Sequence, residues 1–575
     1  MAAYRAPVDD IRFLLLQVLR APDALQAAPA FAEADAGLIV QVLEEAGKFV
    51  ELAVAPLQAV GDTPGCRLVD GNVVTPPGFA SAYRAFWQAG WPALACAPED
   101  GGQGLPWVLE GVLYEMLSGA NHGWTMAPGL LHGAYECLKH HGSEELKARY
   151  LAKVASGEWL ATMCLTEAHA GSDLGLVRTQ AVPQADGSHR IAGTKIFISG
   201  GAHDLTDNIV HLVLAREPGA PPGPKGLSLF LAPKVLADGA RNAVVCERIE
   251  EKMGLHGSPT CVLRFDRATG WRVGEAGRGL AAMFVMMNAA RLHVGLQGIG
   301  LLEAAWQLAH AYAQERTQMR APGPLRGDGA ADPIIRHPAV GRILDTERAW
   351  IDGLRVLAYR TGIELDLARH HSDAERRQAA QQWCSLVTPV LKAVATDAGF
   401  HGASRCLQVF GGHGYVKEWG IEQIVRDSRI AMIYEGTNEI QAIDLLVRKV
   451  LPDGGAAVGA LLDRLAGELP GATPADAQVL RRFDALRAVT AQLVAASAGD
   501  PVLAYAAADD YLRAVGLALF GWAWRLVEAT PGADAPRWSR PAGAARLRVL
   551  PEFEMRLQIL RAQCAAPGHS STAPA

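Results

Sequence analysis

Apolar side chains recur at helical spacing through the first part of the chain, from about residue 31 to 157. Leu38, Val42 and Phe49 follow this spacing, and turns rich in Gly and Pro, such as 98–106, separate the helical stretches. Residues three or four apart share one face of a helix, so the spacing predicts a helical domain over residues 35–159. Residues 1–34 precede it as an N-terminal extension.

The pattern changes after residue 160 to short runs that are rich in β-branched and aromatic residues. Such runs occupy residues 195–198, 211–215, 227–231 and 261–265, and Gly and Pro separate them. Short apolar runs between turn residues are typical of strands. We therefore expect a compact β domain over residues 160–275.

Long helical patterns return after residue 276 and continue almost to the end of the chain. They occupy residues 276–317, 337–370 and 376–410, and a stretch rich in Pro and Gly interrupts the first two. These lengths suit a helix bundle over residues 276–452. Amphipathic segments beyond Pro452 predict an additional helical domain with a short polar tail over residues 453–575. The whole chain is predicted to be mainly α with a central β domain.

Charge and composition argue against several classes of function without excluding a local basic patch. The net charge of -6 and the pI of about 6.3 lack the basic excess typical of nucleic-acid-binding proteins. The nine cysteines are scattered without a Cys-x-x-Cys pair, which favours a reducing, cytoplasmic location and gives no metal-site pattern. The apolar stretch Ala514–Ala523 lies between Arg513 and Arg525 and is too short to span a membrane, so we expect a buried helix.

The most informative motif is the string Ile-Tyr-Glu-Gly-Thr-Asn-Glu-Ile-Gln at residues 433–441. Together with Gln-Val-Phe-Gly-Gly-His-Gly-Tyr at 408–415 and Arg-Asp-Ser-Arg-Ile at 426–430, it resembles the acyl-CoA dehydrogenase family in order and spacing. The glutamate of the Tyr-Glu-Gly-Thr signature is the catalytic base in that family, so the resemblance assigns this role to Glu435. An arbitrary glutamate would more often cap or solvate a helix.

Two further strings resemble the flavin-contacting segments of the family. Met-Cys-Leu-Thr-Glu-Ala-His-Ala-Gly-Ser-Asp at 163–173 resembles the loop over the flavin, although Ala168-His169 stands where proline is common. Residues 193–201 resemble the adjacent strand and turn, with Phe197 and Ser199 in places often held by Trp and Thr. Amides and hydroxyls in such loops hydrogen-bond the flavin and tune it as an electron acceptor. Isolated hydroxyls would more often cap turns.

The resemblance divides the other positions between cofactor and substrate. Glu-Arg-Thr-Gln at 315–318 resembles the segment whose arginine reaches the FAD pyrophosphate of a neighbouring subunit, and Met-Asn-Ala-Ala-Arg at 287–291 is expected to open the long helix beside the CoA portion. The implied FAD-binding residues are Met163, Leu165, Thr166, Phe197, Ser199, Arg316, Gln318, Gln408, Gly411, Gly412, Thr437 and Glu439. The implied substrate-binding residues are Ser172, Asn288, Arg291, Tyr434 and Gly436.

The resemblance covers about residues 35–450 and implies a helical domain, a barrel-like β domain and a C-terminal four-helix bundle that bind FAD. It implies that Glu435 removes the α-proton of an acyl-CoA while the β-hydride passes to the flavin, which gives a trans-2-enoyl-CoA. An electron-transfer flavoprotein as acceptor and a homodimer or homotetramer are also implied. The N-terminal segment and the extension after residue 450 resemble a larger subgroup that includes 3-methylmercaptopropionyl-CoA dehydrogenase, which indicates a short or sulfur-containing acyl group.

Two alternatives remain open at this point. The first is a flavin-containing, nucleic-acid-associated protein of the alkylation-response branch, which also has a helical C-terminal extension. From Asp476 onward, however, 11 Arg or Lys residues stand against nine Asp or Glu residues, too even a balance for a phosphate-binding surface. The second is a catalytically silent scaffold, against which the presence of Glu435 argues.

Overall fold

The structure is a computed structural model that describes residues 4–471 and 473–565. Its described residues form two compact units. The bundle unit comprises those in Met1–Gly47, Gly111–Gly119 and Val294–Ala575, and the barrel unit those in Lys48–Glu110 and Ala120–His293. Each unit is described by itself. The polar tail predicted at the C-terminus lies beyond residue 565, outside the described residues.

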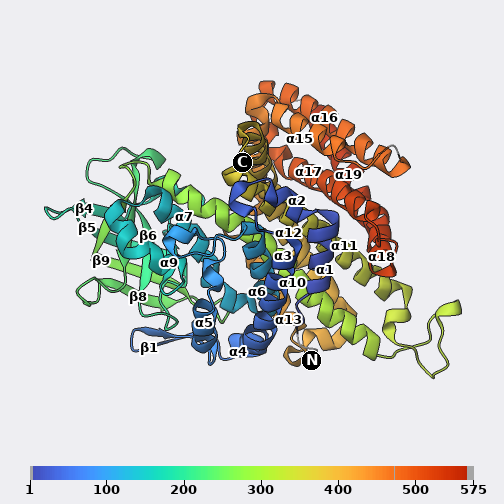
Figure 1. The fold of residues 1–575 in the computed structure, drawn as a ribbon, viewed down its shortest axis with the longest axis horizontal. Helices are drawn as coiled ribbons and strands as arrows, with labels where there is room; N and C mark the ends of the chain where they lie inside the picture. Colours follow the sequence, from blue (N-terminus) through green and yellow to red (C-terminus); the bar gives the residue numbers. More distant parts are fainter. Residues whose placement is uncertain (1–3, 472, 566–575) are drawn as a thin grey trace, which may run out of the picture. The chain divides into compact units, whose positions relative to one another are not determined.

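The barrel unit contains one sheet of seven strands (Figure 1). Its strands are β3 (Leu160–Cys164), β4 (Gln180–Pro183), β5 (His189–Ser199), β6 (Ile209–Arg216), β7 (Leu227–Pro233), β8 (Val244–Ile249) and β9 (Thr260–Val273). Their order is β3-β6-β4-β5-β9-β7, and β7 pairs again with β6, which closes the ring. β3 and β4 run parallel to β6, and the other pairs are antiparallel. The barrel-like β domain is confirmed.

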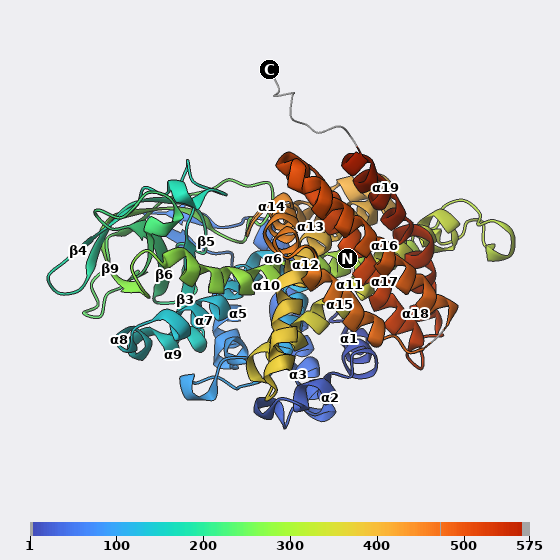
Figure 2. The same ribbon diagram turned by 90° about the horizontal axis from the view of Figure 1, so that it is seen from above.

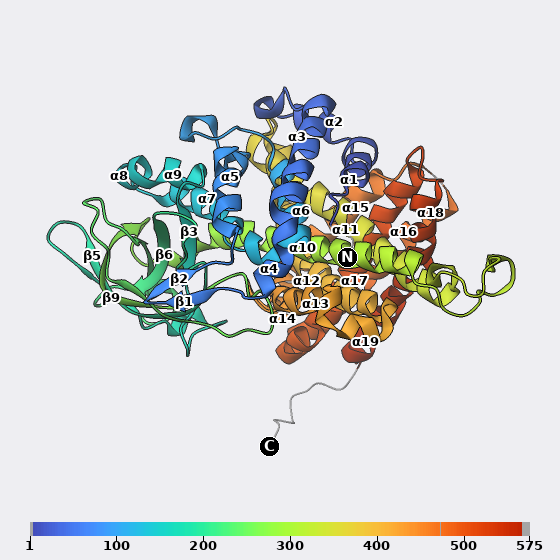
Figure 3. The same ribbon diagram turned by 90° about the horizontal axis from the view of Figure 1, so that it is seen from below.

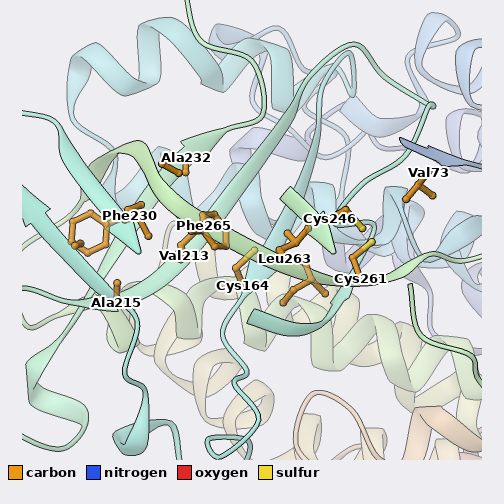
Figure 4. Packing of buried hydrophobic residues seen from close by; sticks show 14 residues of the cluster. Val73, Cys164, Val213, Ala215, Phe230, Ala232, Cys246, Cys261, Leu263 and Phe265 are labelled. Atoms are coloured by element: carbon orange, nitrogen blue, oxygen red, sulfur yellow. The ribbon is translucent and has the colours of Figure 1, made fainter. Parts of the chain in front are cut away.

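The barrel is filled by the apolar runs that predicted the strands. β6 and β7 are buried along nearly their whole length. Val213, Phe230, Leu263 and Phe265 belong to one cluster of buried side chains, to which β3 adds Cys164 (Figure 4). β-branched and aromatic side chains suit this position because they pack well on a pleated surface.

The helical part of the barrel unit also contains a hairpin that the sequence analysis did not predict. The helices wholly inside this unit are α4 (Gln58–Asp62), α5 (Phe79–Gln88), α7 (Leu131–His141), α8 (Glu144–Leu146) and α9 (Ala152–Ala155). The hairpin pairs β1 (Arg67–Val69) with β2 (Asn72–Val74). Asp70 and Gly71 form its turn at φ +49° and +74°. An Asp-Gly pair is a strong hairpin signal because both turn residues need positive φ.

Three helices contribute residues to both units: α3 (Ala36–Phe49), α6 (Trp107–Thr125) and α10 (Gly279–Glu315). α10 begins at Gly279, so Asn288 and Arg291 lie inside the helix, and the prediction that they open it was wrong. The chain turns into the helix earlier because Gly277 adopts φ +71° and its amide donates to Ser228 Oγ at 3.0 Å. Only glycine adopts such a φ without strain.

The bundle unit contains helices and no strand over its described residues. Its N-terminal part holds α1 (Val8–Arg12) and α2 (Ala21–Gln26), and its central part holds α11 (Pro338–His370), α12 (Ala374–Val409), α13 (Ile421–Arg429) and α14 (Asn438–Leu445). α11 packs along α12, and both α13 and α14 contact α12 (Figure 3). The long helices after residue 276 and the break between them are therefore confirmed.

The C-terminal extension is part of the bundle unit. It consists of α15 (Ala456–Gly467), α16 (Pro474–Gly499), α17 (Pro501–Ala529), α18 (Pro536–Ala544) and α19 (Pro551–Ala565). α16, α17 and α19 lie side by side (Figure 2), and α17 also contacts α11, α12 and α14. Close approach is possible because Gly353 faces Phe520 and Gly516 faces Val394, where a Cβ would come within 2.4 Å and 2.7 Å. The predicted buried helix at 514–523 is confirmed as part of α17.

A chain of buried ion pairs crosses the bundle unit. Arg355 donates to Glu115 at 2.7 Å and Glu303 at 2.9 Å, and its side chain is fully buried. Arg348 pairs with Glu303 and with Asp352, both at 2.8 Å. Arg537 of α18 then joins Asp352 to Asp10 of α1, each at 2.7 Å. The two terminal extensions are thus tied to the bundle through charge pairs, and breaking those of Arg355 or Arg348 would leave a buried charge.

Among the described residues, α10 is the one helix that is long and apolar enough to cross a membrane. However, 61% of its apolar window is buried inside the protein. Burial of this kind is typical of a core helix.

Candidate active site

The Tyr-Glu-Gly-Thr motif forms a tight loop between α13 and α14 in the bundle unit. Glu435 adopts φ +57° and Gly436 φ +83°. Thr437 then begins α14, because its side chain accepts a hydrogen bond from the Ile440 amide at 3.3 Å. A glutamate in the left-handed region costs about 1–2 kcal/mol, and such strain persists where surrounding contacts hold it. The catalytic candidate is therefore the strained residue of its loop.

Two neighbouring helices hold the carbonyl groups of this loop. The Lys392 ammonium of α12 donates to the Gly436 carbonyl at 2.8 Å and to Asn438 Oδ1 at 3.0 Å. The Gln441 amide of α14 donates to the Glu435 carbonyl at 3.0 Å. Lys392 and Gln441 are both fully buried. Backbone contacts from buried side chains give the loop one defined conformation.

Tyr434, Glu435 and Thr437 are half-buried, and Glu439 is exposed. Tyr434 donates its hydroxyl to Gln297 Oε1 of α10 at 2.6 Å. Burial raises the pKa of Tyr434 well above its usual range, and the Glu435 carboxylate adds to the rise. The pKa of Glu439 is lowered, chiefly by a hydrogen bond from Thr437. Tyr434 therefore stays neutral and can only donate or accept hydrogen bonds here.

A second group of predicted residues surrounds one pocket of the bundle unit. The pocket has a volume of about 550 Å³ and lies between the end of α10, the segment 334–340 and the 3-10 turn Gly411–Tyr415. Its lining includes Arg316, Gln318, Gln408, Gly411 and Gly412. The structure thus brings together five positions, of which the first and the last, Arg316 and Gly412, are 96 residues apart in the sequence.

Aromatic rings form the wall of this pocket. Tyr312 stacks on Phe410 at 4.3 Å between ring centroids, and His413 stacks on Trp419 at 4.6 Å. The Tyr312 hydroxyl lies 3.0 Å from His413 Nδ1. Stacked rings of this kind form rigid apolar surfaces. The pocket thus combines an aromatic surface with the polar side chains of Arg316, Gln318 and Gln408.

The flavin-loop residues lie in the barrel unit, where a buried ion pair fixes their backbone. Lys195 of β5 is fully buried and donates to the Leu165 carbonyl and to Glu167 Oε1, both at 2.9 Å. The Ile196 amide donates to the Thr166 carbonyl at 2.9 Å. Burial alone would raise the pKa of Glu167, but Lys195 and hydrogen bonds from residues 178 and 179 lower it to about 2. The Lys195–Glu167 ion pair and the Ile196 amide thus hold the backbone of Leu165 and Thr166 next to β5.

Phe197 is held open to solvent beside that loop. Its side chain is 61% exposed and its φ is +58°. The register between β5 and β9 breaks between Lys195 and Ile198, which is where a bulge turns the phenyl ring outward. A bulky residue at positive φ is an outlier, and bulges recur beside active sites. Met163 and Ser199 are half-buried at the ends of β3 and β5.

The predicted substrate residues of the barrel unit are less confined. Ser172 is exposed on the bend that precedes residue 174. Asn288 is exposed on α10, and Arg291 donates to its Oδ1 at 3.2 Å. The Arg291 guanidinium also lies 5.9 Å from the ring of Phe284. Asn288 and Arg291 therefore share one face of α10.

Comparison with known proteins decides the family. The N-terminal, middle and C-terminal domain models of acyl-CoA dehydrogenase match residues 40–158, 162–268 and 277–450. The 3-methylmercaptopropionyl-CoA dehydrogenase of Ruegeria pomeroyi is 43% identical over 532 residues, which cover 90% of each chain. This protein belongs to the acyl-CoA dehydrogenase family. It is thus an oxidoreductase that uses FAD and acts on an acyl-CoA.

Two further relatives agree with this assignment to the acyl-CoA dehydrogenases. The broad-specificity linear acyl-CoA dehydrogenase FadE5 of Mycobacterium tuberculosis is 38% identical over 80% of this chain and 77% of its own. The crystal structure of Caenorhabditis elegans ACDH-11 in complex with C11-CoA has a TM-score of 0.75, with 19% identity over 94% of this chain and 90% of that one. The latter likeness concerns the fold. The relatives give no support to the nucleic-acid-associated alternative.

The pocket of the bundle unit fits part of the FAD that acyl-CoA dehydrogenases bind. No atom lies within 4 Å of a Cβ built on Gly411 or Gly412, so their backbone faces open space. Arg316 is exposed at the rim and offers a guanidinium suited to phosphate. Gln318 is held in place because its carbonyl accepts from His337 Nε2 at 2.8 Å. A guanidinium that can donate hydrogen bonds to phosphate, side-chain amides and glycine backbone without side chains together suit the adenosine diphosphate end of a dinucleotide.

Sequence reasoning missed the residues that hold the acyl-CoA dehydrogenase motifs in place. Lys195, Glu167 and Gln441 lie inside the quoted motifs and Lys392 lies outside them, yet none of the four was assigned a role. Lys392 carried a signal, since it interrupts the apolar stretch at residues 390–395. A lysine at such a position is either solvated or buried against specific acceptors. Distinguishing the two needs the packing of α12 against the loop.

Proposed function

We propose that Glu435 is the base that removes the α-proton of the acyl-CoA thioester. The observation that carries this proposal is the left-handed conformation of Glu435, held from two helices next to Gly436. A general base needs a fixed position more than it needs exposure, because proton transfer requires hydrogen-bonding distance to the substrate carbon. A loop that is strained and still fully anchored is suited to this task.

The other predicted site residues take roles that agree with their surroundings. Leu165, Thr166, Met163, Phe197 and Ser199 would hold the flavin ring beside the Lys195–Glu167 anchor. Thr437 and Glu439 would contact the cofactor at the base loop, and the pocket of the bundle unit would hold the adenosine end of a neighbouring subunit's FAD. Bound FAD supplies the acceptor for the hydride that leaves the substrate Cβ.

For the substrate, Tyr434, Gly436 and Ser172 would contact the acyl thioester, and Asn288 and Arg291 the CoA portion. The Glu435 amide would donate to the thioester carbonyl and so favour loss of the α-proton. We infer a short or sulfur-containing acyl group such as 3-methylmercaptopropionyl-CoA. This inference is supported by the name and 43% identity of the Ruegeria relative.

We further propose that the enzyme passes its electrons to an electron-transfer flavoprotein, acts in the cytoplasm and assembles as a homodimer or homotetramer. The assembly is supported by the open pocket of the bundle unit, whose Arg316 corresponds to the family position that reaches a neighbouring subunit. Met319 and Tyr415, exposed by 79% and 87%, are apolar or aromatic side chains in this region and would be covered in the oligomer. Nine free cysteines agree with a reducing compartment.

The test is anaerobic mixing of the FAD-loaded protein with a panel of acyl-CoAs that includes 3-methylmercaptopropionyl-CoA, butyryl-CoA and a long-chain thioester. We expect loss of the visible flavin absorbance and release of a trans-2-enoyl-CoA. One chain atom changes binding by about 1–3 kcal/mol, so the preferred thioester should exceed its neighbours by about 10-fold or more in kcat/KM. Binding of the whole panel without bleaching would contradict the proposal.

A further inference from the structure

Lys392 is a buried cation directly behind the base loop. Its side chain is 0% exposed, although it occurs in the middle of the long helix α12. A buried ammonium is unfavourable unless acceptors surround it, so such a lysine is retained where its hydrogen bonds have a use. Its Nζ donates to the Gly436 carbonyl at 2.8 Å and to Asn438 Oδ1 at 3.0 Å. These acceptors flank Thr437, so Lys392 forms hydrogen bonds on both sides of the residue at which the loop ends and α14 begins.

The first residue of α14 is locked to the same face of α12. Asn438 Nδ2 donates to the Ala393 carbonyl at 3.2 Å, and the Thr396 hydroxyl, which donates to the Lys392 carbonyl at 2.8 Å, lies 3.2 Å from Asn438 Oδ1. Residues 392, 393 and 396 lie within about one turn of α12, so their contacts converge on one point. Asn438 and Thr396 are also buried. The start of α14 therefore cannot shift along α12 without breaking several hydrogen bonds at once.

Gln441 completes the restraint from the other side of the loop. It donates to the Glu435 carbonyl at 3.0 Å, while Lys392 holds the next carbonyl, that of Gly436. Two successive peptide planes are thus fixed. The direction of the Glu435 side chain follows from the backbone angles on either side of its Cα, and the left-handed angle at Glu435 is disfavoured on its own. Without the two donors the loop would relax to more favourable angles and turn the carboxylate away.

We propose that Lys392, assisted by Gln441, is a positioning residue that holds the Glu435 carboxylate in the geometry for α-proton removal. The inference rests on the proposed role of Glu435 as the base. Lys392 acts through its hydrogen bonds to the Gly436 carbonyl and to Asn438. A displacement of the base by about 1 Å is enough to lower a rate about 100-fold. The effect should fall on the chemical step and spare the binding of substrate and cofactor.

The test compares Lys392→Met with the matched control Lys449→Met. Lys449 belongs to the same unit and donates to the backbone carbonyl of Ser385 in α12 at 2.7 Å, but it lies outside the base loop. For Lys392→Met we expect flavin bleaching by the best acyl-CoA to slow about 100-fold. The dissociation constant of a non-oxidisable thioether analogue and the FAD content should stay unchanged. The isotope effect of an α-deuterated substrate should rise, and Lys449→Met should behave as the wild type.

Gln441→Leu provides a second route if Lys392→Met does not fold, because it removes the contact with the Glu435 carbonyl and leaves the buried ammonium in place. It should also slow bleaching selectively. Bleaching rates of Lys392→Met and Gln441→Leu within about threefold of Lys449→Met would overturn the positioning role. Equal losses in Lys392→Met and Lys449→Met would overturn it too. If no acyl-CoA bleaches the wild type, the proposed function itself fails. If the wild type is bleached normally and the variants are bleached at the same rate, only the positioning role fails.

Discussion

Glu347→Gln should stabilise the protein at neutral and alkaline pH. Glu347 of α11 is fully buried, and its Oε1 accepts from Arg405 at 3.2 Å. Burial raises its pKa from 4.5 to about 7, because the Arg405 guanidinium compensates only in part. The Arg405 side chain is 55% exposed, which weakens its attraction. The carboxyl is therefore protonated in the folded protein at pH 6 and ionised in the unfolded chain.

A raised acid pKa destabilises the folded state as pH increases. Between pH 4.5 and about 7 the folded protein binds more protons at Glu347 than the unfolded chain does, so the free energy of unfolding falls with rising pH in this window. At about 1.4 kcal/mol per pH unit, the difference between these pKa values amounts to about 3 kcal/mol above pH 7. Glutamine keeps the shape of the side chain and cannot ionise, so Glu347→Gln removes this fall in the free energy of unfolding.

The assay is thermal unfolding of the wild type and Glu347→Gln from pH 5 to pH 8, followed by circular dichroism. The midpoint of the variant should gain on that of the wild type by at least about 3 °C across this range, and the gain should level off above pH 7. Glu554→Gln, an exposed glutamate of the same unit, is the control and should show no such trend. Parallel midpoints for the wild type and Glu347→Gln at every pH would refute the reasoning.

Three further variants test other parts of the structure. Arg355→Met should lower the free energy of unfolding by about 3–5 kcal/mol in denaturant titrations, because it leaves buried carboxylates unpaired, whereas the 60% exposed Arg540→Met should change it by less than about 0.5 kcal/mol. Glu167→Gln should release FAD at neutral pH, as judged by flavin fluorescence. In the wild type, the pKa of Glu167 is depressed to about 2. The stabilisation by its ion pair with Lys195 is therefore complete above pH 4.5 and is lost as the pH falls toward 2. Retention of FAD by the variant down to pH 3 would contradict this role for the Lys195 pair. Arg316→Leu should weaken FAD binding and shift the oligomer toward monomer in light scattering, and an unchanged cofactor content would remove Arg316 from the pocket's function.

The sequence was sufficient to predict the main elements and much of the candidate site. Helix periodicity and the Pro- and Gly-rich break before α11 located the long helices, because apolar stripes and chain breakers act locally. Short apolar runs located β5, β6, β7 and β9 of the barrel, whereas β3, β4 and β8 were not among the predicted runs. Motif strings selected the five positions that line the bundle pocket, although their proximity depends on how α10 and α12 pack. No local pattern reports that packing.

Other features depended on tertiary contacts and could not be inferred from the chain alone. Arg348 and Arg355 resemble ordinary charged positions of a helix, yet their partners come from α6 and α10. The exposed Phe197 results from a bulge that breaks the strand pattern. The β1–β2 hairpin did carry a local signal, the Asp70-Gly71 pair, but its strands are only three residues long. Short elements offer too few positions for a periodicity to be detected.

The most direct test of the account is rapid anaerobic mixing of Glu435→Gln with the best acyl-CoA of the wild type. The variant should bind FAD and the thioester as the wild type does, because glutamine keeps the size and hydrogen-bonding reach of the side chain. Flavin bleaching and exchange of the substrate α-proton with solvent should both fall by at least about 1,000-fold, since the base is gone. Bleaching at the wild-type rate would show that another group removes the proton and would contradict the central claim.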